Sequence, residues 1–185
     1  MKTSRLNKEI VIECAMELVD ESGINGLRLN KIAERLEVKS PSLYTHTGSI
    51  TELRHTVVGR AMEEFRAQLV DALLGRANLC AFVELGKSWV TYAKKKNDFY
   101  IVFYQKEYIE TYERKISHFL RAAFERIFFT CELTDKELVQ VERVITNYFR
   151  GNTNDFVESF DEEDLISDLE ILYNGILQNF TKIAQ

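Results

Sequence analysis

Proline is almost absent from this 185-residue chain, and its scarcity constrains the fold more than any other feature. Pro41 is the single proline, and there are eight glycines. Sandwiches and barrels of β-strands need many turns, and turns need more of these two residues than the chain contains. Apolar residues recur instead at helical spacing along most of the sequence. The sequence therefore predicts an all-α fold.

The apolar periodicity predicts three helices at 7–21, 29–36 and 40–47, followed by longer ones. Gly23 is expected to cap the first helix in a left-handed conformation, and Ser40 is expected to N-cap the third, with Pro41 at its first position. Two short helices joined by a tight turn, the second with a polar outer face, are typical of a helix-turn-helix. Further helices are expected at 51–74, at 78–96, at 99–104, up to 129, at 134–155 with a Thr134–Glu137 capping box, and from 161 onward.

Charge and aromatic content divide the chain into two parts. Residues 1–60 contain nine lysines and arginines against eight acidic residues, whereas 61–185 contain fifteen against twenty-one. Tyr44 is the one aromatic residue of the first sixty, and the other twenty lie beyond them. A net charge of −5 disfavours a generic polyanion binder. We expect two domains with different roles, at 1–47 and 48–185.

Cysteine usage and the N-terminus indicate a cytoplasmic protein. Cys14, Cys80 and Cys131 are far apart and odd in number, which excludes a disulfide framework and fits a reducing compartment. Each is expected to be a small buried apolar residue. The N-terminus has neither the apolar run of a signal peptide nor that of a membrane span, so no membrane partner is expected.

Residues 27–46 carry a recognisable pattern, Leu-Arg-Leu-Asn-Lys-Ile-Ala-Glu-Arg-Leu-Glu-Val-Lys-Ser-Pro-Ser-Leu-Tyr-Thr-His. This pattern resembles the DNA-binding signature of the tetracycline-repressor (TetR) family, and the resemblance extends over about residues 7–55. It implies an N-terminal three-helix DNA-binding domain followed by a long-helix domain for ligand binding and dimerisation. It also implies a repressor that binds double-stranded operator DNA as a homodimer and releases it when a small effector binds.

Four positions depart from the family pattern. Glu37 replaces the usual glycine of the turn, and Arg28 replaces the Ser or Thr that normally caps the second helix. Thr47 replaces an aromatic residue, and Ile50 replaces a lysine that usually reaches a phosphate. A turn that needs positive φ would be strained at Glu37.

The candidate DNA contacts lie in and around the third helix. Its outward positions are expected to read bases, and the resemblance makes Tyr44 and His46 phosphate contacts and Asn30 a base contact. The expected DNA-binding set is Asn30, Lys39, Ser40, Ser42, Tyr44, Thr45 and His46. Lys2 and Arg5 are a possible basic arm, although a frayed terminus is the simpler interpretation.

Aromatic residues of the second part are the candidate effector site. Most of them are expected in the core, but tyrosine hydroxyls among apolar rings also suit a pocket for an apolar or planar molecule. The expected ligand-binding set is Trp89, Tyr92, Phe103, Tyr104, Tyr108 and Tyr112.

The last two long helices are expected to form a four-helix bundle across a two-fold axis. The final helix has an apolar arc that is too wide for one neighbour to cover. The expected dimer contacts are Val144, Tyr148, Leu169, Leu172, Tyr173, Ile176 and Phe180, with Gly151 and Gly175 allowing close approach.

The sequence argues against an enzyme. Glu52 and His55 have the spacing of a di-iron motif, but no second Glu-x-x-His exists, and His118 is isolated. Phosphate-binding loops, nucleophile elbows and zinc spacings are also missing. No catalytic residue, metal or cofactor is therefore expected. The alternative is a helical adaptor that binds proteins and has lost specific DNA binding, which a gel-shift assay would distinguish.

Overall fold

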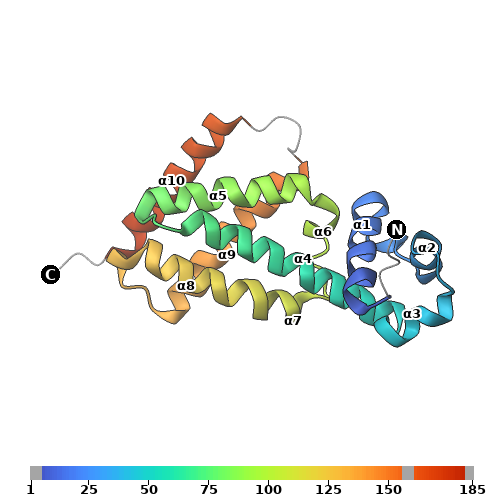
Figure 1. Cartoon of the computed structure of the whole chain (residues 1–185). Helices are drawn as coiled ribbons and strands as arrows, with labels where there is room; N and C mark the ends of the chain where they lie inside the picture. Colours follow the sequence, from blue (N-terminus) through green and yellow to red (C-terminus); the bar gives the residue numbers. More distant parts are fainter. Residues whose placement is uncertain (1–5, 156–160, 182–185) are drawn as a thin grey trace. The chain divides into compact units, whose positions relative to one another are not determined.

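The computed structural model describes residues 6–155 and 161–181, and every regular element in these residues is a helix (Figure 1). The prediction of an all-α fold is confirmed. None of the described helices is long and apolar enough to cross a membrane. The elements are α1 (Lys8–Gly26), α2 (Leu29–Arg35), α3 (Ser40–Thr47), α4 (Ile50–Leu73), α5 (Asn78–Lys95), α6 (Asn97–Tyr100), α7 (Ile109–Tyr112), the π-helical η1 (Glu113–Ser117), α8 (His118–Ile127), the 3-10 turn η2 (Phe129–Cys131), α9 (Asp135–Asp155) and α10 (Glu162–Phe180).

The chain forms two compact units. Unit 1 contains the residues up to Met62 together with Lys96–Thr111, and unit 2 contains Glu63–Lys95 and the residues from Tyr112 onward. Helix α4 contributes its first half to unit 1 and its second half to unit 2.

Unit 1 is held together by an apolar core under α1, α2 and α3. Val11 and Ala15 of α1, Ile32 of α2 and Leu43 of α3 are almost completely buried. An isolated helix of eight residues is not stable in water, so α3 depends on this packing. Leu43 is the buried residue of α3 and therefore fixes which side of the helix faces solvent.

Local capping fixes the ends of the helices in unit 1. The side chain of Asn7 accepts a hydrogen bond from Ile10 N at 3.0 Å and caps α1. Gly23 has the expected positive φ of 68° and a non-helical backbone, so the first helical segment ends just before it, close to the expected residue 21. A second short helical segment continues beyond this kink to Gly26. A capping box of Ser49 and Glu52, which the sequence analysis missed, opens α4.

A segment far along the chain completes unit 1. Helix α6 packs on α1, Lys96 forms an ion pair with Asp20, and His55 of α4 lies 3.5 Å from the Glu107 carboxylate. The segment also buries the rings of Phe99, Tyr100, Phe103 and Tyr108. Unit 1 is thus larger than the three N-terminal helices.

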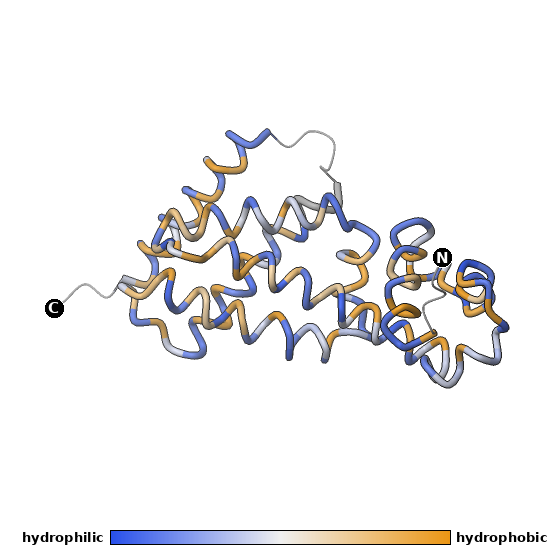
Figure 2. The backbone as a smooth tube through the Cα atoms, viewed as in Figure 1, coloured by the Kyte–Doolittle hydropathy of each residue, from blue (hydrophilic) through white to orange (hydrophobic). Residues whose placement is uncertain are grey.

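Unit 2 is an amphipathic helix assembly around α5. Figure 2 shows hydrophobic and hydrophilic residues alternating along its helices, as amphipathic helices require. Phe82, Leu85 and Trp89 of α5 have no exposed surface. The Trp89 ring stacks on Phe149 of α9 at a centroid distance of 4.6 Å and meets Phe65 of α4 edge-on at 5.1 Å.

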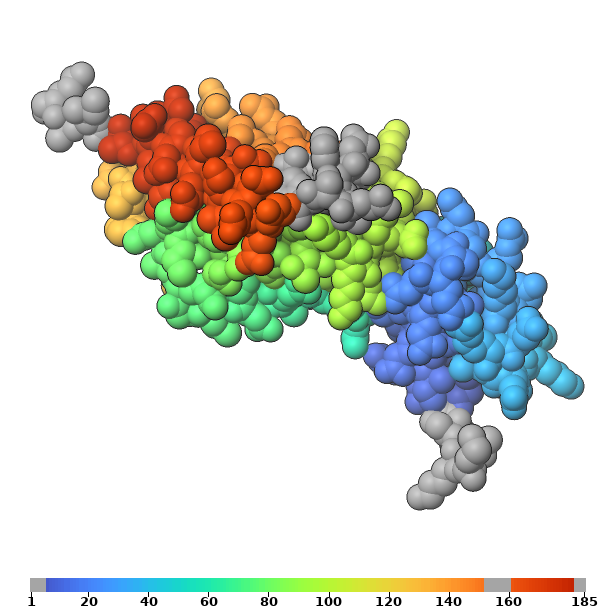
Figure 3. Space-filling view, turned by 90° about the horizontal axis from the view of Figure 1, so that it is seen from above, coloured from blue at the N-terminus to red at the C-terminus, as the bar shows by residue number. Residues whose placement is uncertain are grey.

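Helix α10 lies across α5, as Figures 1 and 3 show. The crossing depends on Gly86, because a Cβ built there would lie 2.5 Å from Leu169 Cδ1 and 3.2 Å from Phe149 Cζ. Leu169 has no exposed surface and so has little room to move. The close contact of the two helices therefore requires glycine at this position.

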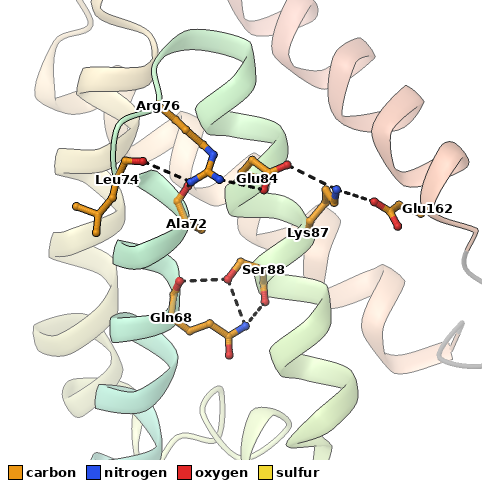
Figure 4. A network of polar contacts seen from close by, with 8 residues as sticks. All are labelled: Gln68, Ala72, Leu74, Arg76, Glu84, Lys87, Ser88 and Glu162. Carbon is orange, nitrogen blue, oxygen red and sulfur yellow. Dashed lines mark hydrogen bonds and ion pairs between the residues drawn. The ribbon is translucent and has the colours of Figure 1, made fainter.

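Polar contacts join α4, α5 and α10 beside this core (Figure 4). The Gln68 amide donates to the Ser88 carbonyl at 2.7 Å, which ties α4 to α5. The Lys87 ammonium lies 3.6 Å from Glu84 and 2.6 Å from Glu162 at the start of α10. These groups are partly exposed, so each contributes little alone.

The long helical stretch from α7 to α8 is interrupted by the π-helical turn η1, which the apolar periodicity did not predict. On its α8 side, Arg121 Nε donates to the buried Glu142 of α9 at 2.6 Å, and Arg121 also bonds Glu113 at 2.7 Å. The buried carboxylate is thereby compensated, as a buried charge must be. Cys14 and Cys131 are buried as expected, whereas Cys80 is exposed in the first turn of α5, so its expected burial is wrong.

Gly86→Ala is expected to lower the free energy of unfolding by about 1–3 kcal/mol, because the added methyl group overpacks the crossing of α5 and α10. Leu169→Ala removes the atom that the methyl group would meet, at its own cost in cavity formation. The two substitutions should therefore be coupled in urea unfolding, with Gly86→Ala less harmful in the Leu169→Ala background. Simple additivity would contradict the role given to Gly86.

Candidate nucleic-acid interface

The turn between α2 and α3 is built from backbone hydrogen bonds. Leu36 N donates to Ile32 O at 2.9 Å, and Val38 N donates to Ala33 O at 2.9 Å. Between them, Glu37 has φ of 54°, in the left-handed region. Glycine adopts this region freely, whereas a side chain makes it costly. The strain expected at this departure is therefore present in the turn.

Helix α2 begins without a side-chain cap. Arg28 occupies the N-cap position in an extended conformation, but its side chain caps no backbone N–H group. A Ser or Thr there would accept such a bond. The helix is instead fastened to α1 by Arg35, whose guanidinium donates to both carboxylate oxygens of Glu21 at 2.9 and 2.7 Å. This hydrogen bond lowers the pKa of Glu21, and it leaves Arg35 engaged away from any phosphate.

Helix α3 presents a polar outer face. Lys39, Ser42, Tyr44 and Thr45 are exposed, and Ser40 and His46 are half-buried. Tyr44 is 57% exposed, so it is not a core residue of unit 1. Asn30 is exposed in the first turn of α2. Six of the seven expected DNA contacts thus lie on or immediately before one short helix.

Two details of α3 differ from expectation. The helix begins at Ser40, its N-cap is Lys39, and no side chain caps it, so the expected N-cap role of Ser40 is wrong. The Thr45 hydroxyl donates to the Ser42 carbonyl at 3.0 Å and is partly satisfied within the helix. Gly48, with φ of 64°, ends the helix and leads into α4.

The remaining departures lie at the junction of α3 and α4. The Thr47 hydroxyl donates to the Leu43 carbonyl at 3.0 Å, and Ile50 begins α4. Glu52 accepts hydrogen bonds from the Ser49 N–H at 2.7 Å and hydroxyl at 3.0 Å, which lower the pKa of Glu52. Its carboxylate therefore caps α4, and the described residues contain no cluster of three or more metal-binding side chains.

Basic groups missed by the sequence analysis lie near this face. Arg28 and Lys31 are exposed and form no ion pair within the described part of the chain. They lie at the start of α2, before the turn between α2 and α3, and their charge was the available signal. Lys2 and Arg5 lie outside the described residues.

The expected effector residues are divided between the two units. Trp89, Tyr92 and Tyr112 are buried in unit 2, and Phe103, Tyr104 and Tyr108 belong to unit 1. The Tyr92 ring lies 4.8 Å from Phe65, and the Tyr104 hydroxyl donates to that of Tyr100 at 3.1 Å. None of the six lines a cavity of about 530 Å³ that unit 2 contains between α4, α5 and α8.

Some of the expected dimer residues are buried within the chain itself. Leu169, Tyr173 and Ile176 are buried against neighbouring helices, whereas Tyr148, Leu172 and Phe180 are half-buried and Val144 is 43% exposed. Ile171, which the sequence analysis missed, is 68% exposed on α10. The Tyr148 hydroxyl bonds Asp168 at 3.1 Å and joins α9 to α10.

Comparison with curated proteins finds transcriptional regulators. The uncharacterised helix-turn-helix regulator YobS of Bacillus subtilis is 25% identical over 95 residues, 51% of this chain and 50% of that protein. The class D tetracycline repressor of Escherichia coli is 49% identical over 43 residues, 23% of this chain and 20% of the repressor. The chain thus spans about half the length of the first relative and less of the second. No protein-family model matches the chain.

Solved structures share the fold. A transcriptional regulator from Rhodococcus has a TM-score of 0.73 at 15% identity, covering 97% of this chain and all of that one. A TetR variant from Acinetobacter baumannii in complex with minocycline has a TM-score of 0.64 at 21% identity, with 97% and 100% coverage. The named relatives are regulators, in agreement with the expectation that the chain is not an enzyme.

Glu37→Gly is expected to raise the free energy of unfolding by about 1 kcal/mol, because it removes the steric cost of a left-handed residue. Glu34→Gly makes the same change three residues earlier, inside α2, and should lower it by about 1 kcal/mol. Urea unfolding of both variants measures the pair of opposite effects. A loss of stability in both would contradict the strain assigned to Glu37.

Proposed function

Because the chain belongs to the TetR family of helix-turn-helix regulators, we propose that it is a transcriptional regulator that binds operator DNA as a homodimer. The observation that carries the proposal is the polar outer face of α3, with Leu43 buried beneath it and Tyr44 exposed. A protein that acts on chromosomal DNA would work in the cytoplasm, as we also propose.

We assign roles to the side chains from their position. Recognition helices place donors and acceptors from their N-terminal part in the major groove, so Lys39, Ser40 and Ser42 read bases. Tyr44 and His46, further along α3, hold phosphates and fix the register without reading sequence. Asn30 and Thr45 also contact bases and complete the set of expected DNA contacts.

A selection experiment tests DNA binding directly. The full chain is incubated with a pool of random duplexes, and the bound fraction is recovered by gel shift and sequenced. A regulator of this kind enriches a palindromic sequence, because a two-fold symmetric dimer reads two equivalent half-sites. A chain that acts only as a protein-binding adaptor enriches none, which would contradict the proposal.

Lys39→Ala is expected to cost about 1–3 kcal/mol of operator affinity and to relax the preference at one base pair of each half-site. Tyr44→Phe is expected to weaken binding evenly across sequences, because a phosphate contact carries no base information. Titration against the selected operator and its single-base variants separates the two effects. Lys136→Ala, an exposed lysine of α9, is the charge-matched control and should leave binding unchanged.

The proposed homodimer is formed by the outer faces of α9 and α10. Val144 and Ile171 are exposed apolar residues there, and a Cβ built on Gly151 or Gly175 meets no atom within 4 Å. An uncovered apolar face with two glycines suits close packing against a second copy of the same helices. The partly buried Tyr148, Leu172 and Phe180 extend this surface, with Leu169, Tyr173 and Ile176 supporting it from beneath.

Light scattering at micromolar concentration should give twice the chain mass of 21.6 kDa. Val144→Asp should shift the mass to that of one chain, because it places a charge in the interface. Val139→Asp, at an equally exposed valine elsewhere on α9, should leave the dimer intact. A monomeric wild-type chain would contradict the dimer.

We also propose that a small effector regulates the protein. Binding of the effector releases the protein from DNA, so the protein acts as a repressor. Helix α4 begins after the α3 cap at Gly48 and contributes to both units, so of the places where the chain joins the two units it is the nearest in sequence to the DNA contacts. An effector that lowers the affinity for operator DNA by some factor must itself bind more weakly by that factor when DNA is bound. The corresponding coupling free energy is typically about 1–3 kcal/mol. The six aromatic residues assigned to the effector stay a prediction.

A further inference from the structure

Unit 2 contains a cavity of about 530 Å³ that the aromatic residues assigned above do not line. It is half open to solvent and is bordered by the last turn of α4, the turn that follows it, the start of α5 and one side of α8. Its volume falls within the range of about 300–1,000 Å³ that is usual for small-molecule sites. The lining is Val70, Leu73, Leu74, Gly75, Arg76, Ala77, Ala81, Phe119, Ala122, Ala123, Arg126 and Ile127.

The apolar part of this lining is accessible to a ligand. Leu74 is 66% exposed at the edge of the cavity, so its side chain is available for contact with a ligand. Alanines and a glycine line much of the remaining wall, so little side-chain volume fills the space. An alkyl chain would cover Leu74 and lie against Val70, Leu73 and Ile127.

The charged residues at the rim of the cavity are basic and not acidic. Arg76 and Arg126 are the charged residues that line the cavity in the described chain, and no acidic side chain lines it there. Arg76 is already used, because its guanidinium donates to the carbonyls of Ala72 at 3.1 Å and Leu74 at 3.4 Å and faces Glu84 (Figure 4). It thereby caps the C-terminus of α4.

Arg126 is not used in this way. It lies in the last turn of α8, is exposed, and makes no ion pair or hydrogen bond within the described part of the chain. The α8 dipole favours a cation at this end, but that explains only the charge and not its position on an apolar cavity. A third arginine lies close by, with the Arg66 guanidinium carbon 5.7 Å from the ring centre of Phe119. The cavity therefore combines apolar walls with an unoccupied cationic donor.

We propose that this cavity binds an amphipathic monocarboxylate, with its alkyl chain against α4 and α8 and its carboxylate on Arg126. Arginine suits this role because its donors match the two oxygens of a carboxylate. Binding of this molecule is independent of the proposed function, but its role as the effector rests on that function. Val70, Leu73 and Leu74 belong to the end of α4 or follow it directly, and α4 is the helix that starts beside α3.

Decanoate is the probe, and isothermal titration calorimetry of the full chain is the measurement. Decanol and decyltrimethylammonium have the same alkyl chain with no charge or a positive charge, and decyl phosphate carries a different anion. Decanoate should bind at least about tenfold more tightly than decanol, as expected for charge-assisted hydrogen bonds. Equal binding of decanol, tighter binding of the cation, or preference for decyl phosphate would each overturn the carboxylate assignment.

Two pairs of variants locate the site. Arg126→Gln should weaken decanoate about tenfold and leave decanol unchanged, whereas Arg143→Gln removes an exposed arginine of α9 and should change neither. Ala122→Phe fills the cavity and should abolish binding, whereas Ala67→Phe adds the same group at an exposed α4 position outside it. Thermal unfolding without ligand checks that all four fold.

The outcomes separate this proposal from the proposed function. If decanoate does not bind, or binds Arg126→Gln as tightly as wild type, the ligand proposal fails while operator binding of the ligand-free chain stands. If the chain binds decanoate but selects no DNA, the proposed function fails and the cavity assignment stands. A change of oligomeric mass in Ala122→Phe would show that a second copy, and not a ligand, covers the cavity.

Discussion

Burial of Leu43 is the interaction on which the DNA-facing surface depends. Helix α3 has eight residues, too few to be stable alone, and Leu43 is its one fully buried side chain. Once this residue is fixed against α1 and α2, helical geometry places Ser42, Tyr44 and Thr45 toward solvent. The polar outer face of α3 is therefore a consequence of core packing and not of the intrinsic helix propensity of α3 itself.

The helix-turn-helix holds despite two unfavourable local features. Glu37 is in a left-handed conformation, and α2 begins without a side-chain cap at Arg28. The compensation comes from packing elsewhere in unit 1, where the core under α1, α2 and α3 buries Val11, Ile32 and Leu43 and 96–111 adds buried aromatic rings. Local strain at functional turns commonly persists when surrounding structure over-determines the backbone.

Periodicity and capping patterns predicted the all-α fold and most helix positions, because these depend on residues close in the sequence. The strained turn was predicted from the family resemblance, in which Glu37 replaces a glycine. The Thr134–Glu137 box is formed as expected, with Glu137 accepting from Thr134 N at 2.7 Å. Long-range packing was out of reach: the assignment of 96–111 to unit 1, the glycine crossing at Gly86 and the cavity around Phe119 involve segments far apart in the chain. Apolar spacing likewise could not tell a buried Leu169 from an exposed Ile171, since both fit the same broad arc.

The central claim is that α3 reads DNA and that two copies do so across a two-fold axis. Hydroxyl-radical footprinting of the full chain on a selected duplex tests it most directly, because it maps the protected backbone at single-nucleotide resolution. The account predicts two equivalent protected tracts on one face of the duplex, about 34–36 Å apart or a multiple of that spacing. A single tract, or protection spread evenly along the duplex, would contradict it.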